Sequence, residues 1–135
     1  MSGTAIKQAA AESKPVHMLL VTDDQLLQHK LSRILASQHC RITFRKPAGP
    51  ASREFQHLPD AGVVLLDIST SLEAILDSLV LFCERHPKTR LVLTVPLSEM
   101  HWWIETIYAG AWECLPKPVE EAELKAVLLR SINGL

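Results

Sequence analysis

The stretch Gly62-Val63-Val64-Leu65-Leu66-Asp67 decides the fold of this chain. An apolar run without polar alternation is typical of a strand buried on both faces of a parallel sheet. The run closes on an acid, Asp67, where such a strand would end. Similar apolar runs, Val16–Val21 and Leu91–Val95, lie before and after it. The chain therefore contains at least three strands of the buried, parallel type.

Between these runs the apolar residues recur at helical spacing, so strands and helices alternate along the chain. The predicted strands are Val16–Val21, Cys40–Phe44, Gly62–Asp67, Leu91–Val95 and Trp112–Leu115. The predicted helices are Gln25–Gln38, Ser52–His57, Leu72–Glu84, Met100–Ala109, ended by Gly110, and Val119–Ile132. This order predicts an α/β fold, a doubly wound five-stranded parallel sheet with helices on both faces.

Composition agrees with one globular domain. The chain has 135 residues, 47% of them hydrophobic, and a formal net charge of -1, so bulk attraction to nucleic acid or an anionic membrane is not expected. No apolar run approaches the roughly 18 residues that span a bilayer. Three cysteines without a CxxC pair fit reduced thiols in a cytoplasm. We expect residues 1–15 to be a flexible leader, with a short helix at Ala9–Glu12, and residues 16–135 to form the domain.

Polar residues gather where the predicted strands end. They are Thr22, Asp23, Asp24, Asp67, Thr94 and Lys117. In doubly wound sheets the carboxyl ends of the strands meet at the ligand site. Two carboxylates suit a hard cation such as Mg²⁺, and a carboxylate is also a nucleophile toward phosphorus. A lysine and a hydroxyl then stabilise the charge on a transferred phosphoryl group.

Each of these residues also has an ordinary structural interpretation when it is taken alone. Asp67 would be a turn or cap residue, Thr94 a strand former and Lys117 a solvated loop lysine. Asp23 and Asp24 would be helix caps. The functional interpretation depends on all of them falling at one edge of one sheet.

From about Val16 to Ile132 the chain resembles the receiver domain of bacterial two-component response regulators, including the single-domain chemotaxis receiver. The matching stretches are Leu19-Leu20-Val21-Thr22-Asp23-Asp24, Val63-Val64-Leu65-Leu66-Asp67, Leu91-Val92-Leu93-Thr94, Ala109-Gly110-Ala111 and Leu115-Pro116-Lys117-Pro118. The resemblance implies that Asp67 is the phosphoacceptor and that Mg²⁺ is the cofactor. It places the metal on Asp23, Asp67 and the backbone carbonyl of Ser69. It assigns Thr94 and Lys117 to phosphoryl contact and switching, with a cis bond from Lys117 to Pro118.

The chain also departs from the family pattern. An ungapped comparison puts Thr22 at the first of two usually acidic positions, with Asp23 at the second and Asp24 outside the pair. A one-residue slip would instead make Asp23 and Asp24 the pair. The usual Met-Pro after the phosphoacceptor is missing, and the loop Ser69-Thr70-Ser71 looks shortened. Cys114 stands where the family has an aromatic switch residue.

Trp102 and Trp103 are adjacent on a predicted helix, so their side chains point about 100° apart. We expect one to be packed and one exposed. Plain packing competes with partner contact, because exposed tryptophan is enriched at interfaces. A partner face of Trp102, Trp103 and Cys114 is the resulting hypothesis.

The leading functional interpretation is a non-enzymatic receiver that accepts phosphate from a histidine kinase or a phosphotransfer protein. It would signal to a downstream output protein or a fused effector domain, without binding nucleic acid or membrane itself. The alternative is a degenerate receiver that works by dimerisation or docking without phosphorylation. A flavin carrier is disfavoured, because no Gly/Ser/Thr-rich phosphate loop follows the first strand.

Overall fold

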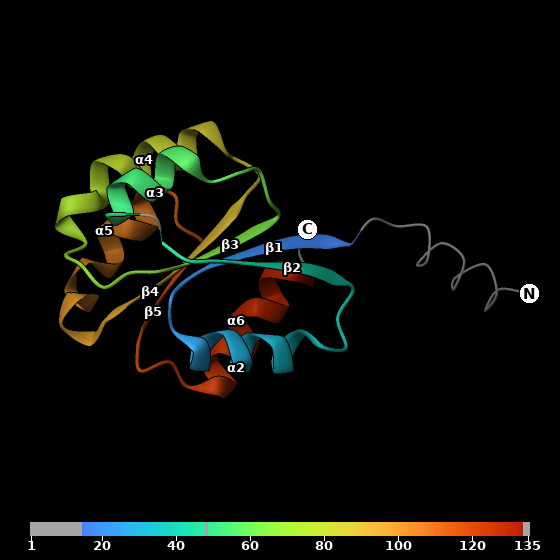
Figure 1. Ribbon diagram of the computed structural model, residues 1–135. Helices are drawn as coiled ribbons and strands as arrows, with labels where there is room; N and C mark the ends of the chain where they lie inside the picture. The colour runs from blue at the N-terminus through green and yellow to red at the C-terminus, as the bar shows by residue number, and fades with distance from the viewer. Residues whose placement is uncertain (1–14, 48, 134–135) are drawn as a thin grey trace, which may run out of the picture.

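The computed structural model describes residues 15–47 and 49–133 (Figure 1). The predicted leader, apart from Pro15, lies outside these residues. Along the chain the elements are β1 (Val16–Val21), α2 (Gln25–Leu35), β2 (Cys40–Arg45), α3 (Ala51–His57), β3 (Val63–Asp67), η1 (Glu73–Ile75), α4 (Leu76–Arg85), β4 (Arg90–Pro96), η2 (Leu97–Trp102), α5 (Trp103–Tyr108), β5 (Glu113–Lys117) and α6 (Glu121–Asn133). The η elements are 3₁₀ helices.

The five strands form one parallel sheet in the order β2-β1-β3-β4-β5. In Figure 1, α3, α4 and α5 cover one face of this sheet, and α2 and α6 cover the other. The chain order reverses between β1 and β3, which makes this the switch point where doubly wound sheets place their ligand site. The predicted fold class is confirmed.

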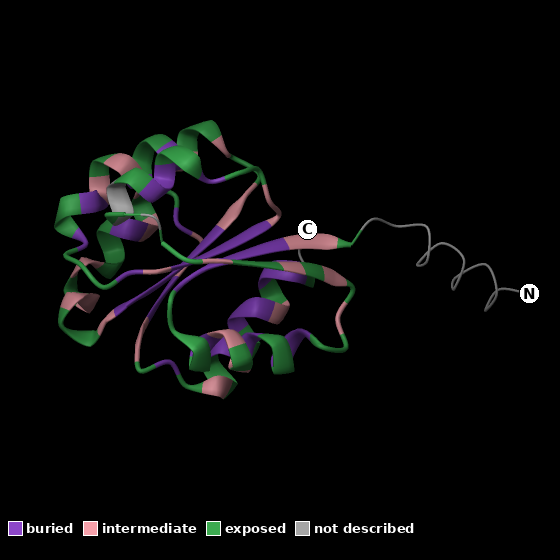
Figure 2. Cartoon of the chain, in the orientation of Figure 1, coloured by how far each residue is buried: buried purple, intermediate pink, exposed green. Residues whose placement is uncertain are grey.

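Alternate residues of β3 enter the two hydrophobic cores. Val64 and Leu66 pack on the side of α3, α4 and α5, and Val63 and Leu65 pack on the side of α2 and α6. All four are buried, as the central strands in Figure 2 show. Burial on both faces explains why the strand reads as a continuous apolar run rather than an alternating one.

Several predicted boundaries were wrong by a few residues. The helix predicted as Gln25–Gln38 ends at Leu35. The helix predicted from Leu72 begins with the 3₁₀ turn Glu73–Ile75. The helix predicted from Met100 is preceded and overlapped by the 3₁₀ helix Leu97–Trp102, so its α-helical part begins only at Trp103. Helical spacing alone does not separate 3₁₀ turns from an α-helix, because both bring residues three apart onto neighbouring positions.

The last strand also differs from its prediction. We expected Pro116 to stop a strand at Leu115, but β5 continues through Pro116 to Lys117. Proline lacks the N–H that a central strand needs, yet it is tolerated on an edge strand. β5 is an edge strand and pairs with β4 alone. This extension carries Lys117 to the carboxyl edge of the sheet.

Gly110 follows α5 with a φ of 115°, in the region that favours glycine. It is also closely packed against Cys83. A Cβ atom added there would lie 2.7 Å from Cβ and 3.1 Å from Sγ of Cys83. The predicted stop of this helix at Gly110 is therefore confirmed, with both a conformational and a packing reason.

We predict that Gly110→Ala lowers the free energy of unfolding by about 1–3 kcal/mol, because the backbone strain and the contact with Cys83 act together. Urea denaturation of the purified chain measures this change. Gly49→Ala is the matched control, since its added Cβ would meet only Arg53 Cδ at 3.8 Å. Equal stability of the two variants would contradict the assignment.

Candidate functional site

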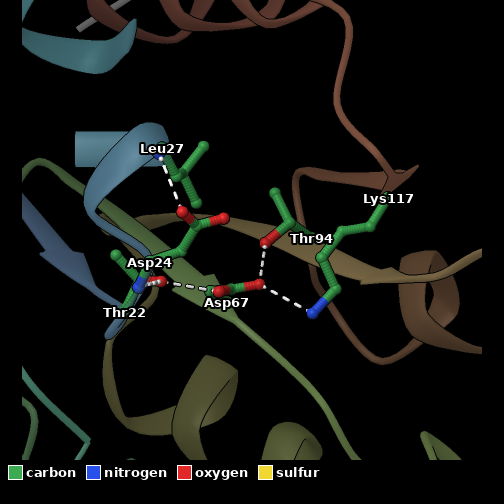
Figure 3. A network of polar contacts seen from close by, with 6 residues as sticks. All are labelled: Thr22, Asp24, Leu27, Asp67, Thr94 and Lys117. Atoms are coloured by element: carbon green, nitrogen blue, oxygen red, sulfur yellow. Dashed lines mark hydrogen bonds and ion pairs between the residues drawn. The ribbon is translucent and has the colours of Figure 1, made fainter. Parts of the chain in front are cut away.

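The carboxyl ends of β1, β3, β4 and β5 bring three polar side chains together around a fourth, Asp67 (Figure 3). Asp67 is the last residue of β3, and its strand partner on β4 is Thr94. Thr22 follows β1 directly, and Lys117 ends β5. The sheet register therefore builds this group from segments far apart in the sequence.

Both carboxylate oxygens of Asp67 are engaged. Oδ1 accepts a hydrogen bond from Thr94 Oγ1 at 2.9 Å and pairs with Lys117 Nζ at 3.0 Å. Oδ2 accepts a hydrogen bond from Thr22 Oγ1 at 2.6 Å. The two oxygens thus have different surroundings, a cation with a hydroxyl on one side and a single hydroxyl on the other (Figure 3).

The ion pair is partly shielded from water. The side chain of Asp67 is 11% exposed and that of Lys117 is 28% exposed. Taking a carboxylate out of water is costly unless it is paired and hydrogen-bonded. Three donors meet this requirement for Asp67. The bond from Lys117 to Pro118 is cis, as the resemblance implied.

Thr22 connects Asp67 to the start of α2. Its buried hydroxyl accepts a hydrogen bond from the backbone N–H of Asp24 at 3.0 Å while it donates to Asp67. Asp24 is the N-cap of α2, and its Oδ1 accepts from the N–H groups of Leu26 and Leu27 at 2.9 and 3.3 Å. Thr22 therefore takes the inner position beside Asp67, and Asp24 caps the helix. Of Thr22, Asp23 and Asp24, the structure shows Thr22 in a hydrogen bond with the side chain of Asp67.

The other two predicted metal ligands are less closely tied to Asp67. Asp23 is exposed and takes part in none of the ion pairs of residues 15–47 and 49–133. Ser69 is exposed on the loop after β3. It lines, together with Asp67, a cavity of about 70 Å³.

The donor set nevertheless fits Mg²⁺, which usually takes one or two carboxylates and completes its shell with water. Asp67, Asp23 and the carbonyl of Ser69 would supply oxygen ligands. Two features weaken the site. The side chain of Thr22 beside Asp67 is neutral, and its hydroxyl holds Oδ2 of Asp67. Within the described part of the chain, no group of three or more His, Cys, Asp or Glu residues could hold a metal.

Glu54 is a site residue that sequence reasoning missed. It lines the same small cavity as Asp67, is 2% exposed, and pairs with Arg45 Nη2 at 2.9 Å. The sequence offered a weak signal, a glutamate beside Phe55 on a short helix, but nothing in the pattern predicted its burial. Glu54 adds a second buried carboxylate to the surroundings of the loop after β3.

The two tryptophans divide as expected. Trp102 packs against the core on the side of α3, α4 and α5, and Trp103 is 43% exposed. Trp103 belongs to an exposed apolar surface, which we name the α5 patch. Its exposed residues are Trp103, Ile104 and Tyr108, which line one shallow surface pocket. Contiguous exposed apolar residues of this kind mark interaction surfaces.

Cys114 does not belong to a partner face, contrary to our hypothesis. It is 2% exposed and part of the core on the side of α3, α4 and α5. Burial raises the pKa of its thiol to about 11, against the opposing effect of a hydrogen bond with Thr106. Its position on β5 points it inward, so a partner could not reach it. Trp102, which is half-buried, also contributes less surface than Trp103.

Comparisons with known proteins begin from the sequence. No protein-family model matches the chain. Protein PetR of Rhodobacter capsulatus is 32% identical over 125 residues, which are 91% of this chain and 49% of that protein. The chain thus spans about half the length of this curated relative.

Solved structures resemble the chain over most of its length. The BeF₃-activated receiver domain of DrrB superposes with a TM-score of 0.66 at 21% identity, covering 88% of this chain and 98% of that one. The chain has the fold of a response-regulator receiver domain. A response regulator from Thermotoga maritima matches this receiver fold with a TM-score of 0.68 at 15% identity, covering 88% and 98%. The pilus assembly protein CpaE of Caulobacter crescentus matches with a TM-score of 0.66 at 17% identity, covering 85% of this chain and 98% of that one.

We predict that Thr22→Val destabilises the folded chain by about 1–3 kcal/mol. The valine keeps the shape of the side chain but leaves the shielded carboxylate of Asp67 with one donor fewer. Urea denaturation measures the loss. Thr22→Ser is the control, because it keeps the hydroxyl and should recover most of the stability. A valine variant as stable as the parent would show that the hydrogen bond contributes nothing.

Proposed function

We propose that this receiver domain is a phosphoacceptor in two-component signalling and that Asp67 takes the phosphoryl group. The single observation that carries the proposal is the grouping of Lys117 and Thr94 on one oxygen of Asp67, at 3.0 and 2.9 Å. A cation and a hydroxyl at that distance from a carboxylate are the groups that a bound phosphoryl would need.

In the proposed reaction an oxygen of Asp67 attacks the phosphorus of a phosphohistidine on a histidine kinase or a phosphotransfer protein. The new O–P bond forms an acyl phosphate as the P–N bond breaks, and the imidazole leaves with the electron pair of that bond. Lys117 and Thr94 would then transfer their contacts from the carboxylate to the phosphoryl oxygens. A bound Mg²⁺ would neutralise part of the charge at the same edge of the sheet.

Thr22 makes this a weakened version of the site. Its hydroxyl at 2.6 Å holds the oxygen of Asp67 that Lys117 leaves free. A metal would have to displace this hydrogen bond, and it would find one inner carboxylate fewer to attract it. We therefore propose weak metal binding and slow phosphorylation.

The three contacts of Asp67 also favour a second candidate function, a docking module that works without phosphorylation. With three donors in place, the carboxylate of Asp67 is already satisfied. The α5 patch would supply the contact surface for an output protein, an effector domain or a second copy of the chain. Tyr108, 87% exposed, is its most exposed member.

Under either proposal the domain turns over no substrate and acts in the cytoplasm. None of the helices in residues 15–47 and 49–133 is both long enough and apolar enough to cross a bilayer. The output of the whole protein is likewise only proposed, because this chain spans about half the length of PetR.

We predict that incubation with acetyl phosphate and Mg²⁺ adds one labile phosphate, seen by intact-mass spectrometry. Asp67→Asn should abolish the added mass, because the amide is not a nucleophile toward phosphorus. Asp60→Asn is the matched control, since that aspartate is exposed outside the site and should leave the label unchanged. A label that persists in Asp67→Asn would contradict the assignment, and an unlabelled parent would favour the docking module.

We predict that Thr22→Asp tightens Mg²⁺ binding about tenfold, equivalent to roughly 1.4 kcal/mol. The added carboxylate raises repulsion in the metal-free site, and the dication relieves it. Isothermal titration calorimetry measures the affinity. Asp24→Ala should change it little, because Asp24 caps α2. The opposite result, with Thr22→Asp unchanged and Asp24→Ala unable to bind, would show that Asp23 and Asp24 are the acidic pair.

A further inference from the structure

A second cavity lies at the opposite edge of the sheet from Asp67. It has a volume of about 600 Å³, within the range of small-molecule sites. His17 on β1 and Arg41 on β2 line one side, and the end of α4 and the turn before β4 line the other. His17, Arg41 and the turn before β4 lie at the amino ends of their strands, whereas Asp67 lies at the carboxyl end of β3.

Basic side chains from two neighbouring strands meet on the first side. His17 and Arg41 are direct partners in the parallel register of β1 and β2. His17 Nε2 makes a hydrogen bond with Thr43 Oγ1 at 3.0 Å. Burial and the charge of Arg41 both lower the pKa of His17. The lowered pKa of His17 reflects, in part, positive potential from Arg41.

The second side adds Arg85, His86 and Lys88. Asp60 is the one acid that lines the cavity, and its Oδ1 contacts His86 Nδ1 at 2.6 Å. The helix dipole favours a cation such as Arg85 at the end of α4. It does not account for Arg41, which lies across the cavity on β2.

Three cations therefore face one acid in this cavity, although the whole chain carries a net charge of -1. Arg41, Arg85 and Lys88 belong to none of the ion pairs found in the described part of the chain. Like charges gathered without compensation repel one another, and a multivalent anion relieves that repulsion. Guanidinium groups match phosphate oxygens with two parallel hydrogen bonds.

We propose that this cavity binds a small molecule carrying two or more linked phosphate groups. One phosphate contacts Arg41 on the strand side, and another contacts Arg85 and Lys88 on the helix side. This ligand site is separate from the phosphoacceptor and does not depend on it.

The test uses inorganic pyrophosphate as the probe, the full chain, and EDTA so that no metal bridges the anion to Asp67. Calorimetry should show one pyrophosphate per chain, bound about tenfold more tightly than orthophosphate, because pyrophosphate brings more negative charge to the three cations of the cavity. Arg41→Glu and Lys88→Glu should each weaken pyrophosphate binding about tenfold. Both residues are exposed, so the folded state should survive, and thermal unfolding checks it.

Two control variants distinguish binding in this cavity from a general effect of charge and from binding near Asp67. Lys125→Glu makes the same change of charge at an exposed position of α6 and should leave pyrophosphate affinity within about twofold. Asp67→Asn should also leave it unchanged. Amide NMR shifts of Gly62 and Thr89 in the parent should move on titration, which locates the site without any variant. Absence of binding, equal loss in Lys125→Glu, or loss in Asp67→Asn would each overturn the proposal.

Discussion

The ion pair between Asp67 and Lys117, supported by the hydroxyls of Thr94 and Thr22, is the interaction on which the carboxyl edge of this sheet depends. A continuous buried strand delivers a carboxylate to a place with little water, so the neighbouring strands must provide its partners. β5 meets this need by running through Pro116 to Lys117. The same contacts that compensate the charge also place a carboxylate beside a cation and a hydroxyl.

Thr22 gives this edge its individual character. It gives the carboxylate of Asp67 a neutral hydrogen-bond donor and adds no second negative charge beside it. Thr22 also accepts from the N–H of the residue that caps α2, so a change at Asp67 reaches that helix through one side chain. Cys114, buried in the core, lacks the aromatic ring that could move between packed and exposed positions.

The sequence predicted the five strands, their parallel direction and the residues at their carboxyl ends, because apolar runs and strand-end residues are local features. It could not predict which oxygen of Asp67 each donor approaches, since that depends on register across four strands. The burial of Glu54 and of Cys114 was missed or misjudged, because it depends on how α3 and β5 pack against the sheet. The 3₁₀ turns before α4 and α5 were missed for a similar reason, since their spacing also fits an α-helix.

A crystal structure of the chain with beryllium fluoride and Mg²⁺ tests the central claim, that Asp67 is a phosphoacceptor surrounded by Lys117 and Thr94, most directly. The account predicts a beryllium fluoride group on Asp67, with the Lys117 ammonium and the Thr94 hydroxyl contacting its fluorines. It also predicts that the hydrogen bond from Thr22 to Asp67 is broken. A structure in which Asp67 keeps all three of its present contacts and carries no beryllium fluoride would contradict the account.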